Sequence, residues 1–332
     1  MTILRVNPFS PDPAVIARAA ELLRGGQVVA FPTETVYGLG ADATNPEAVQ
    51  RIYQAKGRPA YNPLIVHVPD VAAARLLAAS WPSAAQVLAD RWWPGPLTLV
   101  VQKSAVIPDI VTAGRPTVAL RVPANPVAQA ILRAAGIPLA APSANLSGMT
   151  SASQARHVEK GLGDRIPLII DGGPTEIGIE STVVDLTGPA PRLLRPGAIS
   201  RNDLERVLGP LEDPLHANAP NAARPAPGML DRHYAPAAEL LLYLGSHDAE
   251  LQVRVSAAQA AGGMIGAVVH HVLPDACDAF VALPPEPHGY ARGLYQALHE
   301  LDDRGCRLIL VEAPPGTPEW AAVRDRLSRA SS

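Results

Sequence analysis

Residues 31–40 read Phe31-Pro-Thr-Glu-Thr-Val-Tyr-Gly-Leu-Gly40, and residues 56–67 read Lys56-Gly-Arg-Pro-Ala-Tyr-Asn-Pro-Leu-Ile-Val-His67. These stretches place hydroxyls, a carboxylate, an amide, an imidazole and two cations beside apolar runs. A strand that hands over to polar and glycine residues is where α/β proteins commonly build ligand sites. Lys56 and Arg58 flank a glycine in a turn context, and such a pair suits phosphate or carboxylate. The two stretches therefore predict an anion site in an α/β fold.

The composition bounds the class of protein. The chain has 332 residues, enough for two domains of about 100–200 residues each. Its net charge of −3 gives no electrostatic footprint for nucleic acid. Cys277 and Cys306 form no C-x-x-C pair, so we expect buried free thiols in a reducing cytosol. The sequence shows neither a secretory signal pattern nor an apolar run of about 18 residues. We expect a soluble, cytoplasmic protein with no membrane partner.

Helical and strand patterns alternate along the first two hundred residues. Apolar periodicity and glycine stops predict helices over residues 13–24, 46–54, 83–91 and 126–135. Short apolar runs predict strands over residues 28–31, 64–68, 97–102, 117–122, 139–141, 168–170 and 183–186. This alternation indicates an α/β or mixed α+β first domain.

The composition changes between about residues 209 and 236, where Pro, Ala and Asn recur with little periodicity. Such a segment is typical of a linker. Beyond it, strands are expected over residues 239–244, 265–272, 279–283 and 308–311, and helices over 290–304 and 319–328. The pattern predicts a second, smaller parallel α/β domain.

Several common site motifs are absent or poorly placed. Gly38-Leu-Gly-Ala-Asp-Ala43 matches G-x-G-x-x-A, but a polar segment separates it from the strand, so we interpret both glycines as turn formers. The sequence contains no P-loop pattern. His270 and His271 are expected in the middle of a strand, where adjacent side chains face opposite sides, which argues against a metal site.

No serine nucleophile motif is visible either. Ser143 lies in Pro-Ser-Ala-Asn and not in G-x-S-x-G, so it is better placed as a hydrogen-bond donor. Ser143 is therefore not expected to act as a covalent nucleophile.

Four cations occur at strand ends or in Pro/Gly turns: Lys56, Arg58, Arg121 and Arg195. A solvated surface charge is the default interpretation of any one of them, but the recurring context favours polyphosphate chemistry, in which positioning and charge neutralisation supply most of the catalysis. Neutral donors accompany them at Asn145, Ser181 and Thr182. Thr33, Thr35 and His67 either read the polar groups of a small amino acid or cap turns.

With these residues assembled, the chain resembles the YrdC-like family in its long, two-domain form, the threonylcarbamoyl-AMP synthases. The resemblance rests on motifs in the family's order: Pro32-Thr-Glu-Thr-Val-Tyr-Gly-Leu-Gly40, Lys56-Gly-Arg58, Asn62-Pro-Leu-Ile-Val-His67, Trp93-Pro-Gly-Pro-Leu-Thr98, Thr117-Val-Ala-Leu-Arg121, Ala141-Pro-Ser-Ala-Asn-Leu-Ser-Gly148, Asp171-Gly-Gly173, Glu180-Ser-Thr-Val-Val184 and Leu194-Arg-Pro-Gly197. The long form is marked by Pro227-Gly-Met and His233-Tyr-Ala-Pro236. The motifs cover nearly all of residues 10–200.

The resemblance implies a fold and a domain division. The fold is a YrdC-like twisted mixed sheet with flanking helices, followed by a Rossmann-like parallel α/β domain. The implied division is a catalytic domain at residues 1–208, a linker that acts as a lid over the active site at 209–237, and the C-terminal domain at 238–332.

The resemblance also implies a reaction. L-Threonine, bicarbonate and ATP would give L-threonylcarbamoyladenylate and pyrophosphate, with Mg²⁺ on the ATP phosphates and no protein metal ligand. A partner transferase would then move the threonylcarbamoyl group to the adenosine beside the anticodon of tRNAs that read codons beginning with A. Direct tRNA binding by this chain is left open.

Site residues carry over by motif position. Those that resemble the threonine-binding positions are Thr35, His67, Arg121, Ala141 and Ser181. Those that resemble the ATP-binding positions are Arg58, Asn62, Thr117, Ser143, Ser151, Arg195 and Tyr234. The family's signature cluster of two cations and two neutral polar groups matches Lys56, Arg58, Ser143 and Asn145.

The chain departs from the family pattern in two places. Ser151-Ala-Ser153 replaces the usual Ser-Pro-Thr, and Leu230-Asp231 follows Pro-Gly-Met where basic and aromatic residues are common. Three rival functions remain to be weighed. They are an RNA-binding module, a carbamoyl-transfer protein of hydrogenase maturation, and a nicotinamide dehydrogenase. Net charge, the shortage of cysteines for zinc repeats and the poor glycine context argue against them in turn.

Overall fold

The computed structural model describes residues 1–213, 232–243, 249–274 and 277–331. Most of the expected linker, including Pro227-Gly-Met and Leu230-Asp231, lies outside these residues. The described strands are β1 (Thr2–Arg5), β2 (Val29–Pro32), β3 (Tyr37–Asp42), β4 (Ile65–His67), β5 (Leu97–Gln102), β6 (Thr117–Arg121), β7 (Leu139–Ala140), β8 (Leu168–Asp171), β9 (Thr182–Asp185), β10 (Arg192–Arg195), β11 (Glu239–Tyr243), β12 (Met264–Val269), β13 (Ala279–Ala282) and β14 (Cys306–Glu312). The helices are α1 (Pro13–Arg24), α2 (Pro46–Lys56), α3 (Val71–Leu76), α4 (Ser83–Trp92), α5 (Asp109–Thr112), α6 (Pro126–Ala135), α7 (Ala155–Leu162), α8 (Arg201–Leu208), α9 (Ala249–Ala260), α10 (Pro287–Asp303) and α11 (Ala321–Ala330), with 3-10 turns η1 (Gly163–Arg165) and η2 (Pro318–Trp320).

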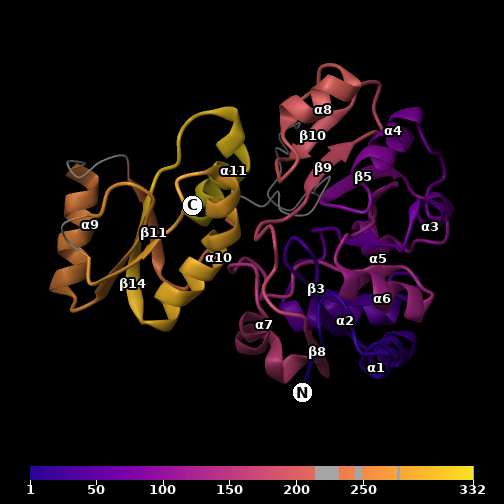
Figure 1. Ribbon diagram of the computed structural model, residues 1–332, viewed down its shortest axis with the longest axis horizontal. Helices are drawn as coiled ribbons and strands as arrows, with labels where there is room; N and C mark the ends of the chain where they lie inside the picture. Colours follow the sequence, from indigo (N-terminus) through magenta and orange to yellow (C-terminus); the bar gives the residue numbers. More distant parts are fainter. Residues whose placement is uncertain (214–231, 244–248, 275–276, 332) are drawn as a thin grey trace.

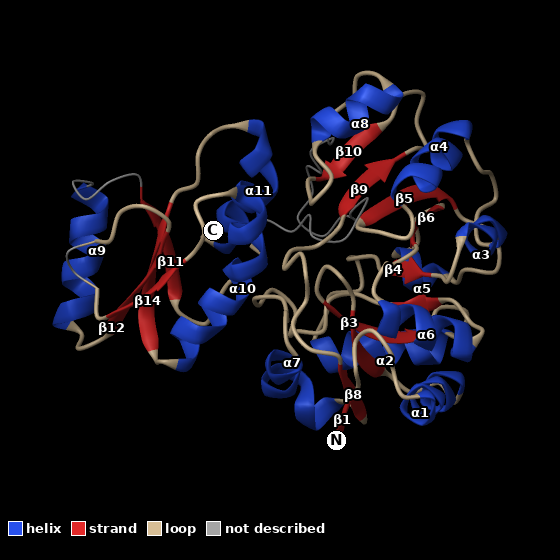
Figure 2. Ribbon diagram, in the orientation of Figure 1, coloured by secondary structure: helices blue, strands red, loops and turns tan. Residues whose placement is uncertain are grey.

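The first two hundred residues form a mixed sheet flanked by helices (Figure 2). Among the described residues its order is β1-β8-β2-β3-β7-β4-β6-β5-β9-β10. Parallel and antiparallel neighbours both occur; for example, β4 runs parallel to β6, whereas β2 and β3 form an antiparallel hairpin. The mixed α/β architecture expected from the sequence is confirmed.

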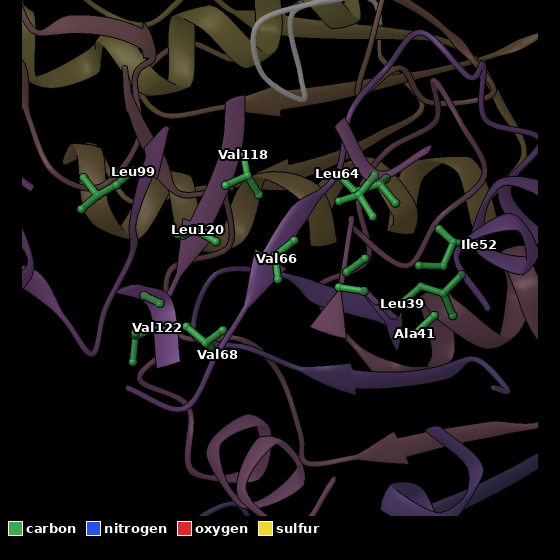
Figure 3. Packing of buried hydrophobic residues seen from close by; sticks show 14 of the residues in the cluster. Leu39, Ala41, Ile52, Leu64, Val66, Val68, Leu99, Val118, Leu120 and Val122 are labelled. Atoms are coloured by element: carbon green, nitrogen blue, oxygen red, sulfur yellow. The ribbon is translucent and has the colours of Figure 1, made fainter. Parts of the chain in front are cut away.

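Apolar side chains from both faces of this sheet pack against helices. On one face, Val127 and Ile131 of α6 join strand residues such as Phe31 and Ile170. On the other face, Ile52 of α2 lies beside Leu39, in a cluster that also contains Val66 (Figure 3). Both faces are covered, so polar side chains at the strand ends are held on a rigid support.

The second sheet is parallel throughout, in the order β11-β14-β12-β13. Helix α9 covers the face that bears Ile265 and Leu308. Helices α10 and α11 cover the opposite face, which is turned toward the large domain (Figure 1). The expected parallel α/β domain is therefore confirmed. Among the described residues, no helix has the length and apolar character needed to cross a membrane.

Two local expectations are corrected. Gly38 and Gly40 are not turn formers, because both lie within β3. A Cβ at position 40 would come within 2.6 Å of the Phe31 ring, so the glycine is needed for close packing. His270 and His271 follow β12, which ends at Val269, and do not lie in the middle of a strand.

Helix caps explain why some boundaries were predictable. In α1 and α6 a proline occupies the first turn, and the Asp12 and Asn125 side chains accept hydrogen bonds from the helix N-terminus. Other elements gave no such signal, and β1, β3, β10 and helices α3, α5, α7, α8 and α9 were not expected. Helix α8 belongs with the first domain, because Leu204 lies in its core.

Candidate active site

A small cavity lies where the large sheet, the β2–β3 hairpin and the segment at 233–234 meet. Its volume is about 40 Å³, enough for a few water molecules and too small for an amino acid together with a nucleotide. It is lined by Thr33, Thr35, Val36, Gly38, Arg58, Ile65, His67, Arg121, Ala141, Pro142, Ser143, Glu180, Ser181, Arg195, His233 and Tyr234.

Parallel strands β4 and β6 bring His67 and Arg121 side by side at their carboxyl ends. Arg121 Nη2 donates to Glu34 Oε1 at 2.8 Å, and both side chains are buried. Burial, reinforced by the Arg121 charge, lowers the pKa of His67 to about 3, so its ring is neutral. His67 Nδ1 and Arg121 Nε have no hydrogen-bond partner among the described residues. Such orphaned buried atoms are expected where a ligand supplies the missing partner.

The hairpin loop that carries Glu34 is held by short hydrogen bonds. Thr33 Oγ1 donates to the Val36 carbonyl at 2.6 Å and lies 2.8 Å from Thr35 Oγ1. The carbonyls of Glu34 and Thr35 accept from Ile177 and Gly178. Thr35 is thereby fixed at the cavity wall.

Arg58 and Lys56 are both buried near the end of α2, but they face different groups. Arg58 lines the cavity and donates to the carbonyls of Asn62 and Pro63. Lys56 Nζ donates to the carbonyls of Ser143 and Asn145 and does not line the cavity. Burial, reinforced by Arg58, lowers the pKa of Lys56 well below its usual value. Burial also lowers the pKa of Arg58, to about 10.

The opposite wall carries Ser181 and Arg195. Arg195 donates through Nε to the Ser181 carbonyl and through Nη2 to Ser181 Oγ, each at 3.1 Å. Ser181 Oγ also lies 2.8 Å from Thr98 Oγ1. The chain Thr98–Ser181–Arg195 thus fixes a buried guanidinium beside the cavity.

The structure does not place every expected site residue at the cavity wall. Those that do not line it are Lys56, Asn62, Thr117, Asn145 and Ser151. Asn145 Nδ2 bonds within its own loop, to the carbonyls of Leu146 and Met149. Thr117 begins β6, and the β4–β6 register aligns it with the segment before Ile65, where Arg58 makes its hydrogen bonds.

Tyr234 reaches the cavity from the segment that joins the two domains. Its φ of 65° is left-handed, an uncommon conformation for an aromatic residue. Thr150 and Gly148 hold it there, because Thr150 Oγ1 donates to the Tyr234 carbonyl and Ala235 N donates to the Gly148 carbonyl. The Tyr234 hydroxyl has no partner among the described residues. Burial lowers the pKa of the adjacent His233 to about 3.

The sequence of the chain is similar to those of known proteins. A family model described as "Telomere recombination" (Sua5_yciO_yrdC) matches residues 21–197, and one described as "Threonylcarbamoyl-AMP synthase, C-terminal domain" matches residues 199–332. The chain belongs to the threonylcarbamoyl-AMP synthase family. Proteins of that name from Pyrococcus abyssi and Bacillus subtilis are each 43% identical to it, the first over 94% of this chain and 93% of the relative, the second over 98% and 95%.

A solved structure supports the same assignment. Pyrococcus abyssi Sua5 complexed with L-threonine superposes with a TM-score of 0.90 at 40% identity, covering 100% of this chain and 98% of that one. The likeness extends over both domains, so this chain is an enzyme of the long, two-domain form. The C-terminal family model begins before α8, although that helix packs in the first domain.

Sequence reasoning missed several residues that shape the site. Glu34 was not expected to pair with Arg121, and Arg326 of α11 was not singled out at all, although it donates to Glu180 Oε2 at 2.8 Å. Glu180 is separated from Arg326 by 146 residues. No local sequence pattern predicts a contact over that separation. From the sequence alone, Arg326 is indistinguishable from a solvent-exposed arginine of an amphipathic helix, although the structure buries it completely.

Proposed function

We propose that this chain synthesises L-threonylcarbamoyladenylate from L-threonine, bicarbonate and ATP, with release of pyrophosphate. The observation that carries the proposal is the set of buried arginines, Arg58, Arg121 and Arg195, around one cavity. Buried guanidinium groups favour ligands that bring several negative charges, such as a carboxylate together with a polyphosphate. The near full-length likeness to named synthases supports the same reaction.

The proposed chemistry needs no covalent enzyme intermediate. The neutral amine of threonine combines with bicarbonate to form a carbamate, with loss of water. A carbamate oxygen then attacks the α-phosphorus of ATP, and the bond from that phosphorus to the bridging oxygen breaks as pyrophosphate leaves. The protein's part is to position the two anions and to stabilise the charge that develops between them.

The roles of individual residues follow from where their polar atoms lie. Arg121, oriented by Glu34, and neutral His67 would bind the carboxylate and polar groups of threonine. Arg58 and Arg195 would neutralise the carbamate and the phosphates. Lys56 would act one step away, by holding the carbonyls of Ser143 and Asn145 and so the loop that carries the Ser143 hydroxyl.

The remaining residues complete the proposal. Thr35, Ala141 and Ser181 would belong to the threonine side, and Asn62, Thr117, Ser143, Ser151 and Tyr234 to the nucleotide side. The expected lid, residues 209–237, lies largely outside the described residues, and of its described part Tyr234 lines the cavity.

Magnesium would be held by the ATP phosphates and not by the protein. Among the described residues, no group of three His, Cys, Asp or Glu side chains is arranged to hold a metal. Glu180, which lines the cavity, and Glu34 are already engaged by Arg326 and Arg121. No step of the proposed mechanism depends on a protein-held ion.

The product would supply a transferase that modifies the adenosine beside the anticodon of tRNAs reading codons that begin with A. Purified protein incubated with threonine, bicarbonate, ATP and Mg²⁺ should yield threonylcarbamoyladenylate and pyrophosphate, detected by mass spectrometry and a pyrophosphate-release assay. Leaving out any one substrate should abolish the product, and Arg58→Ala should reduce it by at least a hundredfold. Pyrophosphate release that does not require threonine would refute the proposal.

A further inference from the structure

The C-terminal domain reaches the candidate active site through one buried carboxylate. Glu180 lines the cavity and comes directly before Ser181. Its Oε2 oxygen accepts from Arg326 Nε of α11 at 2.8 Å and from the Tyr295 hydroxyl of α10 at 2.9 Å. Its Oε1 oxygen accepts from Ser151 Oγ at 2.5 Å. Glu180 therefore joins both C-terminal helices to the catalytic domain at the cavity wall.

The same two C-terminal residues also hold Tyr234. The Arg326 guanidinium carbon lies 5.2 Å from the centre of the Tyr234 ring, within cation–π range. The Tyr295 ring stacks on Tyr234 with centroids 5.9 Å apart. The Arg329 carbonyl accepts from His233 N. Residues of the C-terminal domain thus hold Tyr234, whose backbone is left-handed, in place.

The charges of neighbouring arginines keep Glu180 ionised. Burial alone raises the pKa of Glu180, but the charges of Arg326 and Arg195 outweigh it and lower the pKa to about 2. The carboxylate is therefore ionised, and it is stable in the interior because it has cationic and hydroxyl partners. Removing Arg326 would leave a buried negative charge beside the position proposed for ATP.

The contacts from α10 and α11 include two residues of the nucleotide side. Glu180, Ser151 and Tyr234 receive the polar and ring contacts from α10 and α11, and His299 Nε2 lies 3.0 Å from the Ser151 carbonyl. Ser151 and Tyr234 belong to the set proposed to bind ATP. In contrast, Arg121 of the threonine side is held by Glu34 within the catalytic domain.

We propose that Arg326 and Tyr295 are positioning residues through which the C-terminal domain shapes the nucleotide side of the active site. The proposal rests on the function proposed above. The two residues act through Glu180 and Tyr234 and do not themselves touch the reacting atoms. Loss of Arg326 should weaken ATP binding more than threonine binding, because Arg326 contacts the Tyr234 ring whereas Arg121 keeps its ion pair with Glu34.

The decisive experiment compares Arg326→Met with wild type in steady-state kinetics of the full chain. We expect the KM for ATP to rise at least tenfold, while the KM for threonine and kcat at saturating ATP change by less than about threefold. Arg326→Lys should recover most of the ATP affinity, because it keeps the charge opposite Glu180. Equal increases in both KM values together with a fall in kcat would indicate general loosening and would overturn the proposal.

A matched control separates positioning from docking. Lys160 of α7 forms an exposed ion pair with Asp303 of α10, which also bridges the domains. Lys160→Met should leave all three kinetic constants within twofold of wild type. If it raises the KM for ATP as much as Arg326→Met does, domain docking and not the Glu180 contact is responsible.

Two further variants keep the test decisive. The double variant Glu180→Gln with Arg326→Met should bind ATP better than the two single effects predict, because it leaves no unpaired buried charge. If Arg326→Met does not fold, Tyr295→Phe removes one hydroxyl donor to Glu180 and should raise the KM for ATP about threefold; an unchanged value would then count against the proposal. Calorimetric titration with a non-hydrolysable ATP analogue measures ATP affinity even if the protein forms no product. A protein that lacks the proposed activity can therefore be distinguished from one in which Arg326 does not affect ATP binding.

Discussion

Two pairs of parallel strands in this molecule bring a histidine and a charged residue together at their carboxyl ends, and the two pairs differ in how these groups are hydrogen-bonded. In the large sheet, β4 and β6 end on His67 and Arg121, which leave His67 Nδ1 and Arg121 Nε without protein partners among the described residues. In the small sheet, β14 ends on Glu312, and β12 is followed by His270. Glu312 Oε2 accepts from three consecutive backbone N–H groups, those of His270, His271 and Val272, at 2.7 to 3.2 Å.

The difference teaches what makes a strand end a ligand site. Successive backbone N–H groups form a concavity suited to an anion, and in the small sheet the protein fills it with its own carboxylate. Burial alone raises the pKa of Glu312, but these N–H groups outweigh it and lower the pKa. The large sheet leaves Arg121 Nε without a partner among the described residues, and we propose that a substrate pairs with it, whereas the small sheet pairs its backbone N–H groups with its own Glu312.

The largest expected effect tests the large sheet. Arg121→Met should reduce kcat/KM for threonine by at least a hundredfold, about 3 kcal/mol or more, because it removes a proposed carboxylate partner and leaves Glu34 buried without its cation. Threonine-dependent pyrophosphate release measures this change. The double variant with Glu34→Gln restores charge balance and should recover stability but not threonine affinity. Recovery of both stability and threonine affinity would show that Arg121 has a structural role, as Glu312 has in the small sheet.

The reverse effect is expected in the small sheet. Glu312→Ala removes the charged acceptor of three backbone N–H groups, two of them exposed, and should lower the free energy of unfolding of the C-terminal domain by about 1.5–3 kcal/mol. Denaturant unfolding measures the loss, and kcat/KM should stay within twofold of wild type at a temperature where the variant is folded. A variant that keeps its stability but loses activity would show that the small sheet also serves a ligand.

The part of this comparison that the sequence could predict is limited by distance along the chain. Helices α1 and α6 were predictable because caps and glycine stops are local signals. Lys56 and Arg58 could be singled out because they stand together in one motif. The pairing of Arg121 with Glu34 spans 87 residues, and no local pattern encodes it.

The role of a glycine was likewise beyond local reasoning. Gly40 appeared to be a turn former because glycine tolerates positive φ, but its requirement comes from the Phe31 ring across the β2–β3 hairpin. Once the strands are paired, this requirement is plain. Packing between strands, and not backbone conformation, decides the residue at this position.

A smaller effect should appear in the pH dependence of stability. Burial lowers the pKa of His67 to about 3, whereas an unfolded histidine titrates near pH 6.5. Its contribution to stability is therefore present above about pH 6.5 and is lost as the pH falls toward 3, by about 1.4 kcal/mol per pH unit. Between pH 5 and 6, the free energy of unfolding in urea should fall less steeply with falling pH in His67→Gln than in wild type, by about that amount per pH unit. The exposed His288→Gln serves as the control for loss of an imidazole outside the site.

The smallest expected effect concerns a neutral hydrogen bond at the edge of the large-sheet site. Thr98→Val keeps the shape of a buried side chain but removes the hydroxyl that lies 2.8 Å from Ser181 Oγ. A lost hydrogen bond of this kind costs about 1 kcal/mol, so the KM for threonine should rise about fivefold with kcat within twofold. Thr187→Val is the control. Thr187 lies just beyond β9, its hydroxyl donates to Asp185 at the end of that strand, and it is not part of the cavity wall. A hundredfold rise for Thr98→Val would mean that this hydroxyl contacts the ligand itself, and no rise would mean that the orientation of Ser181 does not depend on it.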